Sequence, residues 1–217
     1  MRDLPRRTVT AAAYGAVIVV SVLAASEVFY AVLALIVGLA ALELAGLRRA
    51  GVVAVLELVV LAAGTVALVW LHIHSERVFG PARVPSELLM TFLAVWAADV
   101  TAYAVGSSLG RRKIAPRISP GKTWEGTIAG FVAAAVVVIL WNRPFLAFPA
   151  WAFPAAVFIG PAAFAGDLLE SWTKRRAGVK DSGALLPGHG GILDRIDSLV
   201  AAAILVAATM AILGGLG

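Results

Sequence analysis

The sequence predicts an all-α, polytopic membrane protein: a helical bundle of about seven transmembrane helices with its N-terminus in the cytoplasm. Of its 217 residues, 61% are hydrophobic and 14% are charged, and the mean hydropathy is +0.93. A soluble domain carries a larger charged share. Seven apolar segments, and the uneven placement of basic residues between them, predict the same fold class.

Two features of the composition exclude other classes. The chain has no cysteine, which excludes a disulfide framework, a thiol nucleophile and a cysteine metal site. Its formal net charge of +5 would also suit nucleic acid, but basic residues in a membrane chain mark the cytoplasmic side or contact anionic headgroups. We therefore expect the lipid bilayer, and no nucleic acid, as a partner.

The membrane spans follow from segment length, because about 20 apolar residues cross about 30 Å of hydrocarbon. The basic N-terminus resembles a signal peptide but has no clear cleavage site, so we expect a retained first span. The sixth segment contains Pro154 and Pro161, which favour kinks inside a bundle. The expected spans are 8–25, 28–47, 52–73, 88–109, 127–141, 151–169 and 198–216.

The basic residues predict the orientation. With the N-terminus in the cytoplasm, 15 of the 18 Lys and Arg residues fall on the cytoplasmic side. This predicts two long cytoplasmic loops, over 110–126 and 170–197, which are rich in Gly, Pro and charge. Residues 1–87 are expected to form N-terminal transmembrane helices without a motif, and residues 88–217 a catalytic membrane domain.

Three aspartates are candidate metal ligands. On a helix beginning near Ile192, Asp194 and Asp197 lie three positions apart, so both carboxylates share one face. Asp167 follows an apolar run, where a carboxylate is costly without a partner, and could approach the same point from another helix. Hard divalent cations prefer such oxygen ligands. The alternative is that Asp194 and Asp197 only cap the last helix.

Two segments between these aspartates each allow two interpretations. The basic cluster over 174–180 either clamps phosphate, which Arg and Lys bind well, or only marks the cytoplasmic side. The glycines around His189 either let the backbone approach a ligand or form a surface turn. His189 itself could bind phosphate, act as a base or orient a neighbour.

The other loop contains RRKIAPRISPGKTWEG, in which Ser119, Lys122, Thr123 and Glu125 lie close together. Thr123 to Glu125 could simply begin the fifth span, since Thr is a good N-cap. The GKT string lacks the upstream Gly and the preceding strand of a phosphate-binding P-loop. We therefore reject that interpretation.

Three further acidic residues lie inside expected spans, where ionisable groups face a cavity or a partner. Asp99, within WAADVTAY, is the best cavity candidate. Glu43 and Glu57 are expected to pair with Arg48 or Arg49 near the membrane interface.

The segment over 171–198 reads SWTKRRAGVKDSGALLPGHGGILDRIDS. It resembles the signature of the phosphatidate cytidylyltransferase (CDP-diacylglycerol synthase) family. GDLLES, ISPGKTWEG and DVTAYAVGSSLG are also similar to family segments, so the resemblance covers about 60% of the chain. The signature positions are met by Ser171, Lys174, Arg175, Lys180, Asp181, Gly183, Leu186, Pro187, His189, Gly190, Gly191, Asp194, Arg195 and Asp197.

The resemblance implies a nucleotidyltransferase of phospholipid biosynthesis, which transfers the cytidylyl group of CTP to phosphatidate and forms CDP-diacylglycerol and pyrophosphate. It implies Mg²⁺ as cofactor, with K⁺ a candidate second cation, at the cytoplasmic face of a bacterial-type inner (plasma) membrane. A homodimer is a candidate assembly. The implied metal ligands are Asp167, Asp194 and Asp197; the catalytic residues are these three with Lys180 and Asp181; the substrate-binding residues are Ser119, Lys122, Lys174, Arg175, His189 and Arg195.

Two alternatives stay open. The same site could act on another phospholipid, such as the ether lipid of CDP-archaeol synthases. An ion-coupled transporter would explain Asp99 and the kinked sixth span, but it predicts inverted repeats and charges at the membrane midplane. The long motif of a CDP-alcohol phosphotransferase is not found in the sequence.

Overall fold

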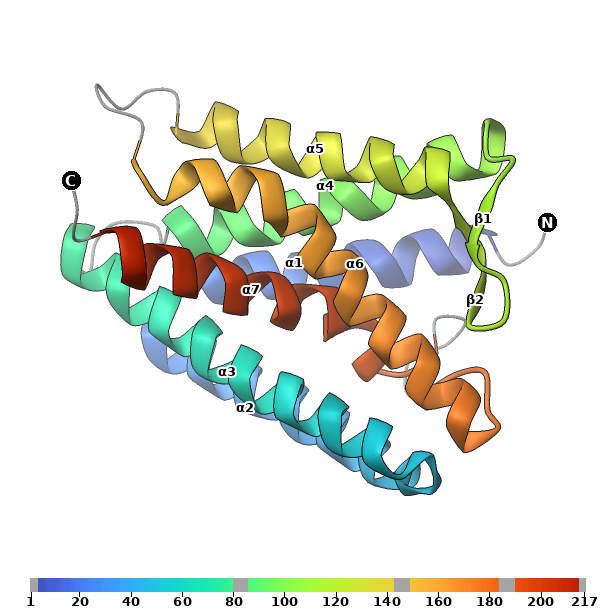
Figure 1. Ribbon diagram of the computed structural model, residues 1–217. Coiled ribbons are helices and arrows are strands. Elements are labelled where there is room, and N and C mark those ends of the chain that lie inside the picture. The colour runs from blue at the N-terminus through green and yellow to red at the C-terminus, as the bar shows by residue number, and fades with distance from the viewer. Residues whose placement is uncertain (1–3, 80–85, 143–148, 184–189, 215–217) are drawn as a thin grey trace.

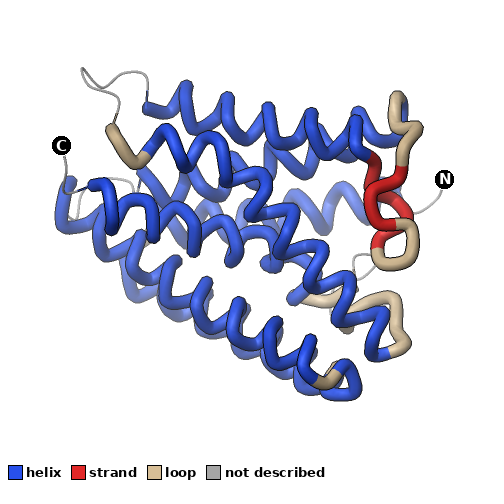
Figure 2. The backbone as a smooth tube through the Cα atoms, in the orientation of Figure 1, coloured by secondary structure: helices blue, strands red, loops and turns tan. Residues whose placement is uncertain are grey.

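The computed structural model describes residues 4–79, 86–142, 149–183 and 190–214. Within these residues the chain forms an all-α bundle with one short hairpin (Figures 1 and 2). Its elements are α1 (Leu4–Leu23), α2 (Ser26–Gly46), the 3-10 turn η1 (Arg48–Ala50), α3 (Val52–Phe79), α4 (Ser86–Ser108), β1 (Lys113–Ala115), β2 (Ser119–Thr123), α5 (Trp124–Asn142), α6 (Ala152–Ala177) and α7 (Leu193–Leu213).

The helices form a membrane-spanning bundle. Among the described residues, six helices, α2 to α7, are long and apolar enough to cross a membrane, and the stretch Tyr14–Leu23 of α1 is also apolar. Large apolar side chains such as Leu42 and Val66 point outward, as expected where lipid is the solvent. The predicted fold class is confirmed: the chain is a polytopic integral membrane protein.

The segments expected on the cytoplasmic side gather at one end of the bundle. Figure 1 shows the α2–α3 turn, the β1–β2 hairpin and the C-terminal end of α6 at this end, where α1 also begins. Arginines of η1 and the basic last turn of α6 lie in these segments. The structure therefore groups the basic segments as predicted, while the side of the membrane that they face stays a prediction.

The connection between α6 and α7 is shorter than predicted. Helix α6 continues through the basic cluster to Ala177, and α7 begins at Leu193, so residues 178–192 join them rather than 170–197. Polar residues in the end turns fall outside an apolar window, so hydropathy alone shortens both helices. Figure 1 shows α6 changing direction along its length, and Pro161 lies inside it, as the kink prediction requires.

The segment over 110–126 is a hairpin rather than an open loop. Strands β1 and β2 pair antiparallel, with Lys113 opposite Thr123 and Ala115 opposite Ser119. The GKT string lies at the end of β2, and the hydroxyl of Thr123 accepts a hydrogen bond from the N–H of Gly126 at 3.2 Å. The predicted helix start at Thr123 is therefore confirmed.

Small residues let α6 and α7 approach closely beside the polar end. A Cβ atom on Gly166 of α6 would meet the backbone oxygen of Asp197 and would lie 2.8 Å from the Cβ of Ala201. Membrane helices associate through such close packing, because lipid offers no hydrophobic driving force between them. The contact places Asp167, the next residue, beside the first turns of α7.

We expect Gly166→Ala to destabilise the bundle by about 1–3 kcal/mol, since the added methyl must push α6 away from α7. Gly38→Ala is the matched control, because a Cβ atom on Gly38 of α2 meets nothing within 4 Å. Thermal unfolding of the two detergent-solubilised variants checks this. Equal midpoints for both variants would contradict it.

Candidate functional site

A cavity of about 810 Å³ lies among α4, α5, α6, the hairpin and the beginning of α7. This volume is within the range of small-molecule sites. Six acidic and four basic side chains line it, a formal excess of two negative charges. They are Asp99, Lys113, Lys122, Asp167, Glu170, Lys174, Asp181, Asp194, Arg195 and Asp197.

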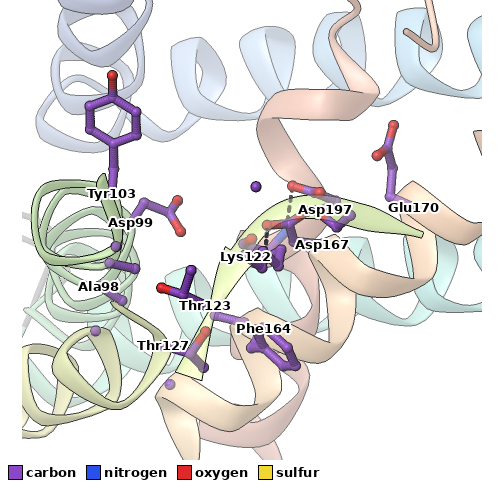
Figure 3. Close-up of a pocket in the computed structure, with 18 of the residues that line it drawn as sticks. Ala98, Asp99, Tyr103, Lys122, Thr123, Thr127, Phe164, Asp167, Glu170 and Asp197 are labelled. Carbon is purple, nitrogen blue, oxygen red and sulfur yellow. Dashed lines mark hydrogen bonds and ion pairs between the residues drawn. The ribbon is translucent and has the colours of Figure 1, made fainter. Parts of the chain in front are cut away.

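Lys122 connects the hairpin to α6. Its Nζ forms an ion pair with Oδ2 of Asp167 and lies 4.6 Å from the ring centroid of Phe164. The hydroxyl of Ser171, one turn further along α6, is 3.4 Å from the other oxygen of Asp167. In Figure 3, Asp99 projects from α4 toward the cavity, across from Lys122, Asp167 and Asp197.

Lys174 joins two buried carboxylates. Its Nζ lies 2.6 Å from Oε2 of Glu170, one turn earlier on α6, and also forms an ion pair with Oδ1 of Asp194 on α7. The side chains of Glu170, Asp194 and Lys174 are 1%, 6% and 12% exposed. A single ammonium group therefore compensates two carboxylates that are largely withdrawn from solvent.

Asp194 also organises the loop that precedes α7. Its Oδ2 accepts hydrogen bonds from the N–H of Gly191 at 2.8 Å and from the hydroxyl of Ser182 at 2.9 Å. The N–H of Ser182 lies 3.3 Å from the same oxygen. The capping interpretation is therefore partly right: Asp194 binds backbone donors before the helix while its other oxygen pairs with Lys174.

Asp197, one turn further along α7, has a different environment. Its Oδ1 accepts a hydrogen bond from the N–H of Ser198 at 2.7 Å, and the residue is 7% exposed. It lines the cavity together with Asp167 and Asp99. Within the described residues, no lysine or arginine lies within ion-pairing distance of it.

The chemistry of these donors fits a hard cation such as Mg²⁺, which prefers carboxylate oxygens. The predicted metal ligands are not arranged around a common point in this structure, however. In the described part of the chain, no group of three His, Cys, Asp or Glu side chains is arranged to hold a metal ion. Lys122 and Lys174 instead pair with Asp167 and Asp194.

Apolar residues line another part of the cavity, including Phe131 of α5 and Phe164 of α6. Tyr103 of α4 belongs to the same lining, yet the residue is 79% exposed. The cavity therefore reaches the outer surface of the bundle beside α4. In a membrane, that surface contacts lipid.

Most of the predicted site residues come together in this cavity, and so does Asp99. Two predicted residues lie elsewhere. Arg175 is exposed and donates hydrogen bonds to the carbonyls of Ile118 and Val179, at 3.1 and 3.2 Å, and Lys180 is exposed outside the lining. His189 lies outside the described residues. The predicted residues that line the cavity are Ser119, Lys122, Asp167, Lys174, Asp181, Asp194, Arg195 and Asp197.

The sequence patterns did not predict the contacts that three acidic residues make. Glu170 joins the site through Lys174, and its spacing of four residues from that lysine is the signal that could have found it. The pairing of Glu43 and Glu57 with neighbouring arginines is wrong. Glu43 binds the start of α7, and Glu57 accepts a hydrogen bond from the hydroxyl of Thr173 on α6 at 3.3 Å.

The fold and the site define a polytopic helical membrane protein with a charged cavity that is open beside α4. The family model described as "Cytidylyltransferase family" matches residues 53–213. The chain therefore belongs to the cytidylyltransferase family, as the signature over 171–198 predicts.

Curated relatives support this membership. A phosphatidate cytidylyltransferase of Brucella abortus is 48% identical over 122 residues, which cover 56% of this chain and 45% of the relative. The protein of the same name from Haemophilus influenzae is 46% identical over 125 residues, which cover 53% of this chain and 42% of the relative. That from Synechocystis is 48% identical over 132 residues, covering 58% and 44%. The matched segments thus span less than half the length of these relatives.

Proposed function

We propose that this protein transfers the cytidylyl group of CTP to phosphatidate, giving CDP-diacylglycerol and pyrophosphate. The observation that carries the proposal is the cavity, because its polar part holds mixed charges while Tyr103 in its lining is exposed on α4, a helix long and apolar enough to cross a membrane. A soluble nucleotide and a membrane lipid could meet there. The names of the curated relatives support the same reaction.

The reaction joins two anions, so charge compensation and positioning are its main demands. A phosphate oxygen of phosphatidate attacks the α-phosphorus of CTP, and the bond from that phosphorus to the bridging oxygen breaks as pyrophosphate leaves. Lys122, Lys174 and Arg195 line the cavity and offer positive charge to the phosphates. No enzyme nucleophile is needed, because phosphatidate itself supplies the attacking oxygen.

Mg²⁺ would be held by carboxylates of Asp167, Asp194 and Asp197, with K⁺ as the candidate second cation. When bound, the metal would offset phosphate charge and polarise the phosphorus–oxygen bonds. Lys122 and Lys174 have flexible stems and can turn from these carboxylates toward phosphate oxygens.

We place the site at the cytoplasmic face of a bacterial-type inner membrane. The positive-inside rule supports this side, because the basic last turn of α6 and the arginines of η1 lie at the cavity's end of the bundle. Phosphatidate would then enter sideways from the inner leaflet, past Tyr103. The homodimer considered from the sequence stays a prediction.

The test is an assay of the purified protein in detergent with CTP, phosphatidate and Mg²⁺. We expect CDP-diacylglycerol and pyrophosphate in equal amounts, and at least about 100-fold less product after EDTA treatment, because uncompensated phosphates repel each other. Added Mg²⁺ should restore the rate, and replacing K⁺ by choline tests the second cation.

An acceptor panel separates the alternatives. Preference for an ether-linked phospholipid over phosphatidate would reassign the lipid substrate. No CDP-lipid from any acceptor with any divalent cation would refute the proposed function.

A further inference from the structure

Glu43 belongs to α2, in the part of the chain where the sequence shows no motif and ahead of the family match at residue 53. The residue is 9% exposed, yet its carboxylate reaches the start of α7. Its Oε1 accepts a hydrogen bond from the N–H of Ile192 at 3.0 Å, and its Oε2 accepts one from the N–H of Leu193 at 2.9 Å. Both carboxylate oxygens therefore bind backbone donors about 150 residues away in sequence.

These contacts explain how a buried carboxylate is tolerated there. The first N–H groups of a helix have no partners within the helix, and the helix dipole makes this end positive. The N-cap residue of α7, Ile192, makes no side-chain hydrogen bond to these N–H groups. Glu43 thus supplies, from another helix, the acceptor for two N–H groups at the beginning of α7, in addition to the acidic residue Asp194 in the first turn of that helix.

Two signature glycines make room for this carboxylate. A Cβ atom on Gly183 would lie 2.7 Å from the carboxyl carbon of Glu43, and a Cβ atom on Gly191 would lie at the same distance. Neither glycine has the positive φ that would itself require glycine. At Gly183 the lack of a side chain is therefore explained by the close approach of Glu43, and at Gly191 by the close approach of Glu43 together with the hydroxyl of Ser182.

Ser182 connects Glu43 to the charged cavity. Its hydroxyl lies 3.1 Å from Oε2 of Glu43 and 2.9 Å from Oδ2 of Asp194. Asp194 in turn forms the ion pair with Lys174. Glu43 is thus two contacts from side chains that line the cavity, without lining the cavity itself.

We propose that Glu43 is a positioning residue, which fixes the loop before α7 and the first turn of that helix so that Asp194 and Lys174 are held in place for catalysis. The catalytic part of this inference rests on the proposed function. The positioning part rests only on the contacts of Glu43 with Ile192, Leu193 and Ser182. N-terminal helices without a recognisable motif would therefore contribute to the site through this residue.

The test compares Glu43→Gln with Glu27→Gln, a matched control on the exposed surface of the same helix. An amide has the shape of the carboxylate but no charge, and its NH₂ group cannot accept a hydrogen bond from a backbone N–H. We expect hydrogen exchange at the amides of Ile192 and Leu193 to be about tenfold faster in Glu43→Gln, and unchanged in Glu27→Gln.

The kinetic readout separates positioning from a general loss of stability. We expect kcat to fall by about 10–100-fold in the folded Glu43→Gln protein, with the KM for phosphatidate little changed, because Glu43 does not line the cavity. Glu43→Asp keeps the charge and should lie between wild type and Glu43→Gln in both exchange and kcat. This variant carries the test if Glu43→Gln does not fold.

A glycine variant tests the same contact from the opposite side. Gly183→Ala should raise exchange at Ile192 and Leu193 as Glu43→Gln does, because the three nearest atoms that its Cβ would meet all belong to Glu43, and the double variant should add little. Gly46→Ala is its control, since a Cβ atom on Gly46 of α2 meets nothing within 4 Å.

The outcomes distinguish the two proposals. Exchange at Ile192 and Leu193 that is unchanged in both Glu43 variants would overturn the positioning role. So would unchanged kcat in Glu43→Gln beside an active wild type. A wild type without cytidylyltransferase activity would refute the proposed function, while faster exchange at these amides would still support Glu43 as the residue that fixes the start of α7.

Discussion

Asp194→Asn is expected to lower CDP-lipid formation by about 1000-fold or more, the largest effect that we predict for a substitution that keeps side-chain shape. The carboxylate does two things at once. Its Oδ1 pairs with Lys174, and its Oδ2 accepts hydrogen bonds from Gly191 and Ser182. An amide can face either the ammonium group or the backbone donors with its oxygen, but not both.

The measurement is the initial rate of CDP-lipid formation, together with the thermal midpoint of the same preparation. We expect a loss of stability of about 1–3 kcal/mol, because donors that faced the carboxylate lose their acceptor. Glu27→Gln is the comparison: Glu27 is exposed on α2 and lies outside the cavity lining, so its loss should leave the activity nearly unchanged. A rate for Asp194→Asn within tenfold of wild type would contradict the role given to Asp194.

The elements that could be predicted from the sequence are those set by local spacing. Apolar length predicts each helix, and the three-residue spacing of Asp194 and Asp197 predicts one helical face beginning near Ile192; α7 begins at Leu193. Helix ends were less predictable. Hydropathy ends the sixth span near Leu169, because the residues that continue α6 to Ala177 include charged ones such as Glu170 and Lys174, which line the cavity.

The parts of the site that could not be predicted depend on contacts distant in sequence. Glu43 binds backbone N–H groups, which carry no side-chain signal, so nothing in its neighbourhood indicates Ile192 as a partner. Arg48 and Arg49 are nearer in sequence and opposite in charge, and this is why the sequence predicts them as partners. The family signature over 171–198 contains five of the ten charged residues that line the cavity, but it did not reveal that lysines pair with two of the predicted metal ligands.

Lys174→Met is expected to destabilise the protein by about 3–5 kcal/mol, because it leaves two buried carboxylates without their shared cation. Glu170 and Asp194 both lose the ammonium group, and their side chains are only 1% and 6% exposed. Arg176→Met is the matched control: Arg176 is in the same last turn of α6 but is exposed, so its replacement should change stability by less than about 0.5 kcal/mol. Reversible unfolding in detergent gives both values.

A second substitution separates structural compensation from catalysis at this position. Glu170→Gln removes one of the two carboxylates, so Lys174→Met combined with Glu170→Gln should recover part of the lost stability. The double variant should nevertheless stay inactive, because no ammonium group remains there to compensate a phosphate. Recovery of both stability and activity would show that Lys174 only neutralises Glu170 and Asp194. Recovery of stability alone would show that the buried pair holds the lysine where the phosphates of the substrates need it.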